Sequence, residues 1–559
     1  MRDGVPPRGR WGEAVDRLVL FLERDRLSII GVFLYILLVA LIRDISEYYL
    51  LDRIFVIEPH PWIYSIAHHV AFYFLTFFGL VLLLSAFTRR GVRRAVNFVS
   101  TFFWVIVLPP YLDHFVFGSD ENYAYFSPAD FINYIMHFSG STFHPGQAIE
   151  IIAVVAAILG YGLWVKRASF GSVEGRVLMT VEMALLVVFT LVSLFIMATP
   201  GAYMPVGAID GVPVFPGYDV TRYHQLHLFI FSYYVILLLG ILGSLLYLNN
   251  PKIFRQIGLS LRPAQTIMFT GIVAAGIASG WSSYAGSVYV TRILDKPYWV
   301  NLEFVILSVV SSMLAWLVST MWNDLSDQAG DIPGKAGRAL ASGLVGRGEL
   351  AQVSVVLMAL SLIVAALLSW WHVAILAVIY SLSYVYSFPP VRFKERILSP
   401  LLLGMGTFLA FLYGYMTPLS AVRLFQGDPD LVYPDSWAPV MPPLTMQAVL
   451  LGMYMFIGLV VGSMITDIDG YEEDRRGRVR TVYTQLGLER GKRVVSALIM
   501  LTSLTPLALF QELTDVIVFP LLGAVASYLF LRTGRSRHVL LLALAGMAYA
   551  GCRFLSVWA

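Results

Sequence analysis

The stretch VILSVVSSMLAWLVSTMWNDLSDQAGD, residues 305–331, joins an apolar run to a polar end that is rich in carboxylates. A transmembrane helix needs about 20 apolar residues, and the pattern predicts a span near 299–322. Asp324, Asp327 and Asp331 follow this span at helical positions i, i+3 and i+7, which places them on one face. Because carboxylates beside hydrocarbon are costly, this face indicates a function.

A second acidic stretch, Asp467-Ile468-Asp469-Gly470-Tyr471-Glu472-Glu473-Asp474, follows a predicted span at 446–466. Carboxylate oxygens one helical turn apart suit Mg²⁺, which keeps several waters and shares its coordination shell with phosphate oxygens. The two stretches therefore predict a magnesium site and a diphosphate substrate.

Composition indicates an all-α polytopic membrane protein. The 559 residues are 58% hydrophobic and 13% charged, with a mean hydropathy of +0.72, which excludes an ordinary soluble domain. About fifteen stretches are long enough to span a bilayer: 28–43, 62–86, 97–116, 147–165, 177–198, 226–247, 264–286, 299–322, 350–369, 372–387, 398–416, 446–466, 491–511, 516–532 and 537–556. Cys552 is the single cysteine, so no intrachain disulfide or thiolate metal cluster can form.

Basic residues gather in every second connection between the predicted spans. The groups are Arg89, Arg90, Arg93 and Arg94; Lys166 and Arg167; Lys252, Arg255 and Arg262; Lys335, Arg338 and Arg347; Arg392, Lys394 and Arg396; Arg475, Arg476, Arg478 and Arg480; and Arg532, Arg535 and Arg537. The positive-inside rule predicts that these connections, both acidic stretches and the N-terminus are cytoplasmic. The basic residues are membrane flanks, so the lipid bilayer is the expected partner and nucleic acid is not.

A turn at Asn249-Asn250-Pro251-Lys252 predicts two domains, residues 1–250 with about six spans and residues 251–559 with about nine. The histidines divide unevenly between them: His60, His68, His69, His114, His137, His144, His224 and His227 precede the turn, and His372 and His538 follow it. This asymmetry predicts separate chemistry in the two domains.

Residues 255–559 resemble the UbiA superfamily of intramembrane prenyltransferases over essentially their whole length. The resemblance rests on five segments in the right order: Leu261-Arg262-Pro263; the Asn-Asp-x-x-Asp-x-x-x-Asp run at 323–331; Arg338-Ala339-Leu340-Ala341-Ser342-Gly343; Tyr386-Ser387-Phe388-Pro389-Pro390-Val391-Arg392-Phe393-Lys394; and the second acidic stretch, followed by Arg480-Thr481 and Leu486-Gly487.

The resemblance implies a helical bundle whose central cavity opens toward the cytoplasmic leaflet and binds a polyprenyl diphosphate through Mg²⁺. Its residue roles, carried onto this chain, are one metal site at Asn323, Asp324, Asp327 and Asp331, another at Asp467 and Asp474, and a diphosphate-binding group of Arg338, Arg392, Lys394 and Arg475 with Asn323. Asp324, Asp327, Asp467, Asp474 and Lys394 are the implied catalytic residues. Chemistry agrees, because metals and cationic side chains stabilise a departing diphosphate and apolar walls shelter an allylic cation.

One position departs from the family pattern. Gly470 stands where the second motif usually has an aspartate, and Asp469 lies next to it. Either Asp469 substitutes as a metal ligand, or the second metal has fewer protein ligands, or the second site has decayed and the protein binds an isoprenoid without turning it over. The acceptor of an active enzyme is a lipid or an aromatic molecule, with geranylgeranylglyceryl phosphate and aromatic acids of quinone synthesis as the leading choices.

Residues 1–250 resemble no family that we identify. All eight of their histidines fall on the predicted extracytoplasmic side, and His224 and His227 are one helical turn apart. A second site for a transition metal or haem is therefore a hypothesis, with candidate residues His68, His69, Asp113, His114, His137, His224 and His227. Interfacial hydrogen bonding to lipid headgroups is the alternative.

Two rival functions follow from these features. One is a membrane redox protein in which the histidines bind a metal or haem and the UbiA-like half only binds an isoprenoid. The other, a transporter, is weaker because the acidic residues cluster at helix ends and not at mid-membrane depth. An arginine-rich, cysteine-poor composition suits the cell membrane of a prokaryote, either archaeal or of high genomic GC content.

Overall fold

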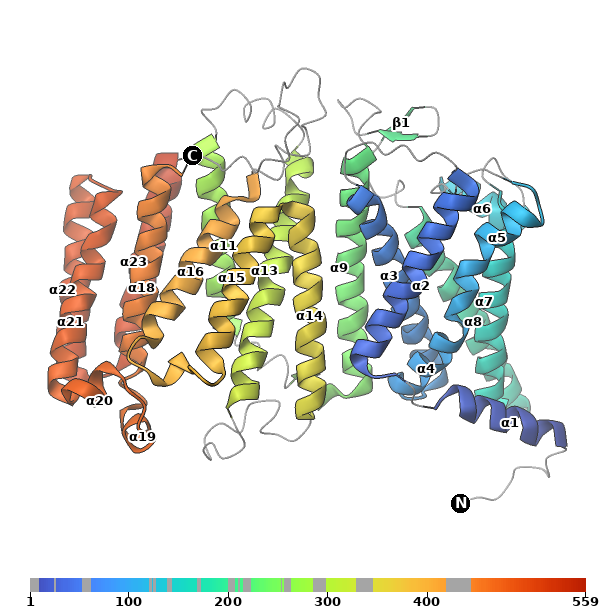
Figure 1. Cartoon of the computed structure of the whole chain (residues 1–559), viewed down its shortest axis with the longest axis horizontal. Helices are drawn as coiled ribbons and strands as arrows, with labels where there is room; N and C mark the ends of the chain where they lie inside the picture. The colour runs from blue at the N-terminus through green and yellow to red at the C-terminus, as the bar shows by residue number, and fades with distance from the viewer. Residues whose placement is uncertain are drawn as a thin grey trace. The chain divides into compact units, whose positions relative to one another are not determined.

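A computed structural model of the chain describes residues 10–24, 27–52, 62–119, 123, 127–137, 143–167, 172–199, 207–209, 212–214, 223–252, 254–255, 263–284, 298–327, 345–418 and 444–558. Contacts divide the chain into two compact units, Met1–Ile257 and Gly258–Ala559. The sequence predicts this division at 250/251. Each unit is a bundle of long helices (Figure 1).

The N-terminal unit contains nine α-helices, two short irregular helices and one hairpin among its described residues. They are α1 (Arg10–Leu22), α2 (Ile29–Glu47), the π-helical turn η1 (Tyr48–Asp52), α3 (Trp62–Thr88), α4 (Val92–Phe102), the 3₁₀ helix η2 (Phe103–Val107), α5 (Leu108–Phe115), α6 (Pro128–His137), α7 (Pro145–Val165), α8 (Val173–Ala198), the antiparallel strands β1 (Gly207–Ile209) and β2 (Val212–Val214), and α9 (Tyr223–Asn249). Helix α3 packs against α2, α4, α8 and α9 and so forms the centre of this unit.

The C-terminal unit is helical throughout its described part. Its elements are α11 (Pro263–Tyr284), α13 (Tyr298–Ser326), α14 (Arg347–Leu368), α15 (Trp370–Ser387), η5 (Phe393–Glu395), α16 (Ser399–Tyr415), α18 (Met446–Thr466), α19 (Tyr471–Arg476), α20 (Val482–Leu486), α21 (Leu488–Leu504), η6 (Thr505–Ala508), α22 (Leu513–Thr533) and α23 (Ser536–Trp558). Nine of these described helices are long enough to form the bundle, as the sequence predicts: α11, α13, α14, α15, α16, α18, α21, α22 and α23.

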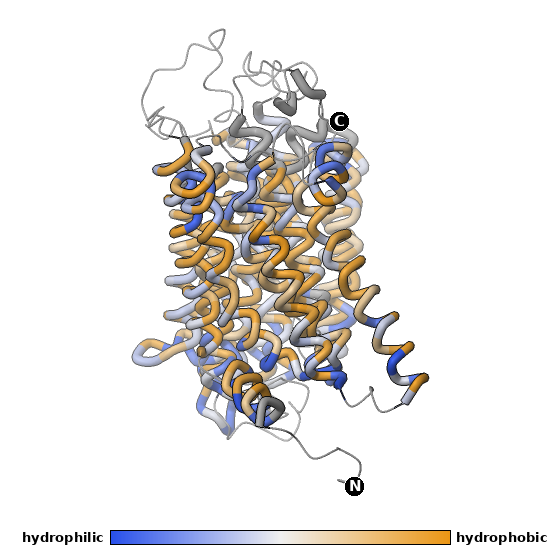
Figure 2. Tube along the Cα trace, turned by 90° about the vertical axis from the view of Figure 1, so that its right-hand side faces the viewer, coloured by the Kyte–Doolittle hydropathy of each residue, from blue (hydrophilic) through white to orange (hydrophobic). Residues whose placement is uncertain are grey.

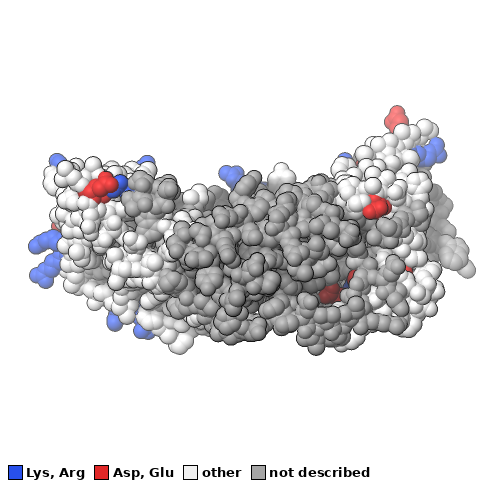
Figure 3. Space-filling model, turned by 90° about the horizontal axis from the view of Figure 1, so that it is seen from above, with Lys and Arg blue, Asp and Glu red and all other residues white. Residues whose placement is uncertain are grey.

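Eleven helices within the described residues are long and apolar enough to cross a membrane, six in the N-terminal unit and five in the C-terminal unit. The middle of the helices is hydrophobic and their ends are more hydrophilic (Figure 2). Seen from above, charged side chains among the described residues are sparse (Figure 3). The prediction of an all-α multi-pass membrane protein is confirmed.

Glycine allows two helices of the C-terminal unit to approach each other closely. A Cβ atom on Gly276 of α11 would lie 2.1 Å from the carbonyl oxygen of Phe411, and one on Gly414 of α16 would lie 2.0 Å from that of Val273. Gly276 and Gly280 are four residues apart, the small-xxx-small spacing that brings membrane helices together. Any larger residue at these positions would push α11 and α16 apart.

The C-terminal bundle brings its sequence motifs to one end. Helices α13 and α18 end there, and so does α15, whose connection to α16 contains η5 (Figure 1, lower end). The short helices α19 and α20 lie at the same end. This end therefore contains the described part of the first acidic stretch, the second acidic stretch and the basic segment around Lys394.

Candidate active site

The first acidic motif forms the last turn of α13. The helix ends at Ser326, and the backbone N–H of Asp327 still donates to the carbonyl of Asn323 at 3.0 Å. Asp324 is buried, with 8% of its surface exposed. Asp331, the fourth member of the motif, lies outside the described residues, as does Arg338. The described part of the motif thus presents Asn323, Asp324 and Asp327 within one helical turn.

A lysine from the α15–α16 connection contacts this motif directly. Lys394 in η5 forms an ion pair with the carboxylate of Asp327, and its Nζ also donates to Ser326 Oγ at 2.7 Å. Both charged side chains are largely buried, with 12% and 16% exposed for Lys394 and Asp327. Burial lowers the pKa of Lys394, and Asp327 opposes that effect. A cation therefore neutralises the end of the first motif.

Arg392 positions the same connection. Its Nη2 donates to the carbonyl of Ser326 at 3.3 Å, and its Nη1 pairs with Glu395 at 2.9 Å. Its backbone has φ of 44°, a left-handed conformation that costs a non-glycine residue about 1–2 kcal/mol. The contacts with Ser326 and Glu395 offset this cost, and the turn allows Lys394 to reach Asp327.

The second motif begins where α18 ends. Asp467 caps that helix, and Asp474 lies on α19, where its N–H donates to the carbonyl of Gly470 at 2.9 Å. Burial raises the pKa of Asp467 to about 7, and the negative charge of Asp474 adds to the effect. The two carboxylates are therefore close enough to repel each other, which is the arrangement that a bound cation would relieve.

Asp469 points elsewhere. Its carboxylate accepts a hydrogen bond from Ser536 Oγ at the start of α23, and its side chain is exposed. A Cβ atom on Gly470 would lie 3.7 Å from the carboxylate of Asp474, so the site leaves ordinary van der Waals space at the position of the missing aspartate. Arg475, also on α19, is exposed.

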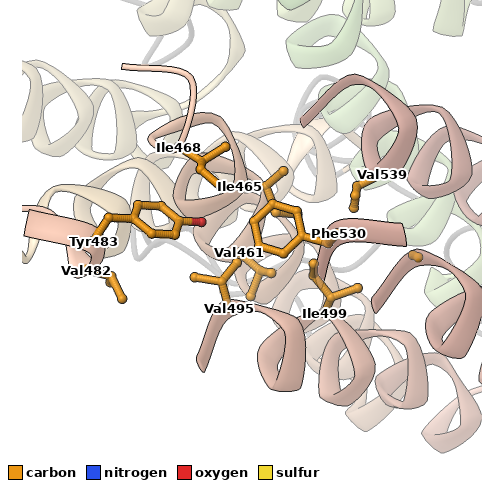
Figure 4. Packing of buried hydrophobic residues seen from close by; sticks show 10 residues of the cluster. Val461, Ile465, Ile468, Val482, Tyr483, Val495, Ile499, Phe530 and Val539 are labelled. Atoms are coloured by element: carbon orange, nitrogen blue, oxygen red, sulfur yellow. The ribbon is translucent and has the colours of Figure 1, made fainter. Parts of the chain in front are cut away.

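A buried apolar cluster holds the second motif in place. Ile465 and Ile468, which flank Asp467, pack against residues of α20, α21, α22 and α23 (Figure 4). Tyr483 in α20 is fully buried, and its hydroxyl donates to the carbonyl of Met464 at 3.0 Å. Loss of a buried aromatic side chain such as Phe530 typically costs about 3–5 kcal/mol, so this cluster gives the loop a fixed base.

A backbone hydrogen bond links the segments of the two motifs. The N–H of Arg480, just after α19, donates to the carbonyl of Glu395 at 2.9 Å. Glu395 belongs to the same 3₁₀ turn as Lys394, which contacts Asp327. The basic connection therefore touches the first motif and the segment that follows the second.

Comparison with known proteins identifies the C-terminal unit. The sequence profile of the UbiA prenyltransferase family matches residues 281–541. The chain carries a UbiA prenyltransferase domain. It is thus a membrane-embedded prenyltransferase, and the resemblance found from the sequence motifs is confirmed.

Several solved structures are similar to this chain. One, from work on digeranylgeranylglyceryl phosphate synthase in membranes, has 15% identity and a TM-score of 0.38, and covers 53% of this chain and 94% of that chain. A UbiA homologue from Archaeoglobus fulgidus bound to GPP and Mg²⁺ has 16% identity and a TM-score of 0.36, with coverage of 53% and 98%. The same homologue bound to DMAPP and Mg²⁺ has 16% identity and a TM-score of 0.35, with coverage of 52% and 96%. No curated protein matches the chain.

The described candidate metal or haem residues of the N-terminal unit do not gather into a metal site. In the described part of the chain, no group of three or more His, Cys, Asp and Glu side chains is arranged to hold a metal ion. His69 pairs with Asp44, Asp113 accepts hydrogen bonds from Tyr123 and from the N–H of Gly146, and His137 is exposed. His68 is buried, and His114 packs edge-on against Phe115. His224 and His227 lie in α9, but their side chains are outside the described set.

Sequence reasoning missed several residues that make these contacts. Ser326 lies inside the quoted acidic run, yet its hydroxyl has no place in an aspartate pattern. In the N-terminal unit, buried Arg43 donates to Glu47 at 2.9 Å, and Glu150 also interacts with it. These charged residues lie in or beside predicted spans, and the cost of burying charge in a membrane is the signal that could have found them.

Proposed function

We propose that the UbiA domain transfers a polyprenyl group from a polyprenyl diphosphate to a hydrophobic lipid or aromatic acceptor. The observation that carries the proposal is the contact of Lys394 with Asp327 and Ser326 at the end of the bundle that also contains Asp467 and Asp474. Carboxylates and a buried ammonium group together suit a metal-bound diphosphate, in which phosphate oxygens need both kinds of partner.

The oxygen donors of the two motifs fit Mg²⁺. Asn323, Asp324, Asp327 and Asp331 would hold one ion, and Asp467 and Asp474 would hold the other. Asp469 is the less suitable ligand because Ser536 already donates to it. Bound Mg²⁺ would supply positive charge that weakens the bond between the allylic carbon and the diphosphate oxygen.

The protein side chains would complete the charge balance. Lys394 and Arg392 already lie at the first motif, and Arg338 and Arg475 are the further candidates for binding the diphosphate. As the C–O bond breaks, negative charge grows on the leaving diphosphate, and these cations would stabilise it. The apolar helices would keep water from the allylic cation until the acceptor attacks.

Two acceptor classes fit the proposal, a geranylgeranylglyceryl phosphate and an aromatic acid of quinone synthesis. We further propose that the site faces the cytoplasm, with the N-terminus on the same side, in the cell membrane of a prokaryote. The basic residues of the alternate connections support that orientation.

Membranes that contain the full-length protein, incubated with labelled geranylgeranyl diphosphate, Mg²⁺ and both acceptor classes, test the proposal. We expect a labelled product that requires Mg²⁺ and is lost on chelation with EDTA. Asp324→Ala should abolish it, and Glu489→Gln, at an exposed carboxylate of α21, should not. Equal product from Asp324→Ala and wild type would refute the site assignment.

A further inference from the structure

The N-terminal unit contains two buried polar clusters that differ in how completely their groups are paired. The Glu23 cluster consists of Glu23, Arg90, Asn97 and Tyr161. The Arg43 cluster consists of Arg43, Asp44 and Glu47 on α2, His69 and Tyr73 on α3, Asp113 on α5, Tyr123, and Glu150 on α7. Buried charge in a membrane unit either joins helices or serves a site, and the pairing distinguishes these roles.

The Glu23 cluster is balanced. Arg90 donates to both carboxylate oxygens of Glu23, at 3.0 and 2.8 Å, and Tyr161 donates to the same carboxylate at 2.8 Å. Asn97 donates to the backbone carbonyl of Glu23 at 3.0 Å. Arg94 Nη1 lies a further 3.9 Å from the same carboxylate. The buried anion is therefore fully compensated by paired groups, which is sufficient to explain a structural role.

The Arg43 cluster is unbalanced. Arg43 is only 2% exposed; its Nη1 donates to Glu47 at 2.9 Å, and its guanidinium lies 4.6 Å from the ring centre of Tyr123. Its Nε is buried and has no hydrogen-bond partner among the residues that the structure describes. An unsatisfied buried donor costs about 1–3 kcal/mol, and more for a charged group, so a structural role alone does not explain it.

The Arg43 cluster lies within the membrane-spanning part of the unit and is partly exposed at His69. Arg43 lies eight residues before the end of its span at Leu51, about 12 Å along the helix. His69 and Glu150 lie near the starts of their spans, at the same end of the unit. The side chain of His69, which pairs with Asp44, is 32% exposed, so a ligand can approach from its side.

Charge defines the class of ligand. Glu47 and Glu150 interact with Arg43, the one permanent cation of the cluster. Asp44 pairs with His69, and Asp113 accepts a hydrogen bond from Tyr123. With four carboxylates to one permanent cation, the cluster repels an anion. The described residues offer no group that could hold a metal ion. A neutral oxygen can accept the N–H of Arg43, and a hydroxyl can also donate to a carboxylate.

We propose that the Arg43 cluster binds the neutral hydroxyl or carbonyl headgroup of a membrane-soluble molecule. The oxygen accepts a hydrogen bond from Arg43 Nε, and the hydrocarbon part lies among the membrane-spanning helices. This site is separate from the diphosphate site and does not depend on the reaction proposed there.

Three labelled probes test the proposal on the purified full-length protein. All contain a branched isoprenoid chain: phytol has a hydroxyl, phylloquinone has quinone carbonyls, and phytane has no oxygen. We expect phytol or phylloquinone to bind more tightly than phytane. Arg43→Lys keeps a charge beside Glu47 but removes Nε, and it should weaken that binding about tenfold or more. Arg90→Lys is the matched control in the Glu23 cluster, and it should leave binding unchanged.

A second control separates binding at the Arg43 cluster from binding at the UbiA domain. Asp327→Asn changes only the C-terminal unit, so the preference for the oxygenated probes over phytane should remain as in wild type. A photoreactive diazirine analogue of phytol, applied to wild-type protein, gives a readout that does not rely on a variant folding. Crosslinks are expected in α2, α3 or α7. The proposal is overturned if neither oxygenated probe binds better than phytane, if Arg43→Lys binds as wild type does, or if crosslinks occur only within α11–α23 or not at all.

Discussion

The two acidic motifs of the UbiA domain lie at the same end of the bundle but differ in how their charge is compensated. In the first, Lys394 pairs with Asp327 and also bonds to Ser326. In the second, burial raises the pKa of Asp467 to about 7, and the negative charge of Asp474 adds to the effect. A metal ion must therefore compete with a protein cation at the first motif, whereas at the second it would relieve repulsion between carboxylates. Residue patterns alone assign both motifs the same role and conceal this difference.

The largest expected effect is at Asp324, the buried carboxylate of the first motif. Asp324→Ala should lower turnover about 10³-fold or more. The variant lacks a ligand of the proposed metal ion and so loses the stabilisation that this ion would give the leaving diphosphate. Turnover with labelled geranylgeranyl diphosphate measures it. Glu489→Gln, at an exposed carboxylate of the same domain, should stay near wild type.

The second-largest effect is expected at Lys394, the residue that compensates the charge of Asp327. Lys394→Met should lower turnover about 10²-fold, since one stabilising cation for the leaving diphosphate is removed. At the same time, Mg²⁺ should bind more tightly to the free variant, because Asp327 no longer has its lysine partner.

The control for this lysine is Lys492→Met, which removes the pair of the largely buried Lys492 with the exposed Glu489. It should change neither turnover nor the Mg²⁺ concentration for half-maximal activity. Should the two lysine variants behave alike, Lys394 would have no special part in the site.

Two neighbouring aspartates of the second motif test which of its carboxylates bind the metal. Asp467→Asn should reduce turnover about 10²-fold at saturating Mg²⁺. Asp469→Asn should reduce it less than about threefold, because that carboxylate bonds to Ser536 and asparagine can still accept this hydrogen bond. The ratio of the two effects tests whether Asp469 replaces the family ligand missing at Gly470, and a larger loss in Asp469→Asn would reverse our assignment.

Much of the C-terminal fold was predictable because long apolar runs and motif order are local properties of the sequence. The nine-helix bundle and the UbiA family follow from them. The pairing of Lys394 with Asp327 was not predictable as a contact, since it depends on the left-handed turn at Arg392, a conformation that arginine rarely adopts. Nor could spacing show that Asp469 turns toward Ser536, 67 residues further along the chain.

In the N-terminal unit, residue type misled the site prediction. Histidines attracted attention as metal ligands, yet the described ones are dispersed among aromatic, carboxylate and solvent contacts. Arg43 carries the inference in this unit, because its unsatisfied Nε depends on which side chains three helices bring to it. Burial of a hydrogen-bonding atom is a tertiary property that no motif encodes.

The smallest expected effect concerns stability in the absence of metal. The folded-state pKa of Asp467 is raised from 3.8 to about 7, so the folded protein holds this proton more tightly than the unfolded chain. Its contribution is therefore fully present below about pH 4 and is lost as pH rises toward 7. In EDTA, the thermal midpoint of wild type relative to Asp467→Asn should fall across that window, by a few degrees at most. Added Mg²⁺ should reverse the loss near pH 7, because the ion takes over from the proton in offsetting the two carboxylates. Parallel midpoints of the two proteins from pH 4 to 7 would mean that neither burial nor Asp474 raises the pKa of Asp467. The contrast between the motifs would then lie in Lys394 alone.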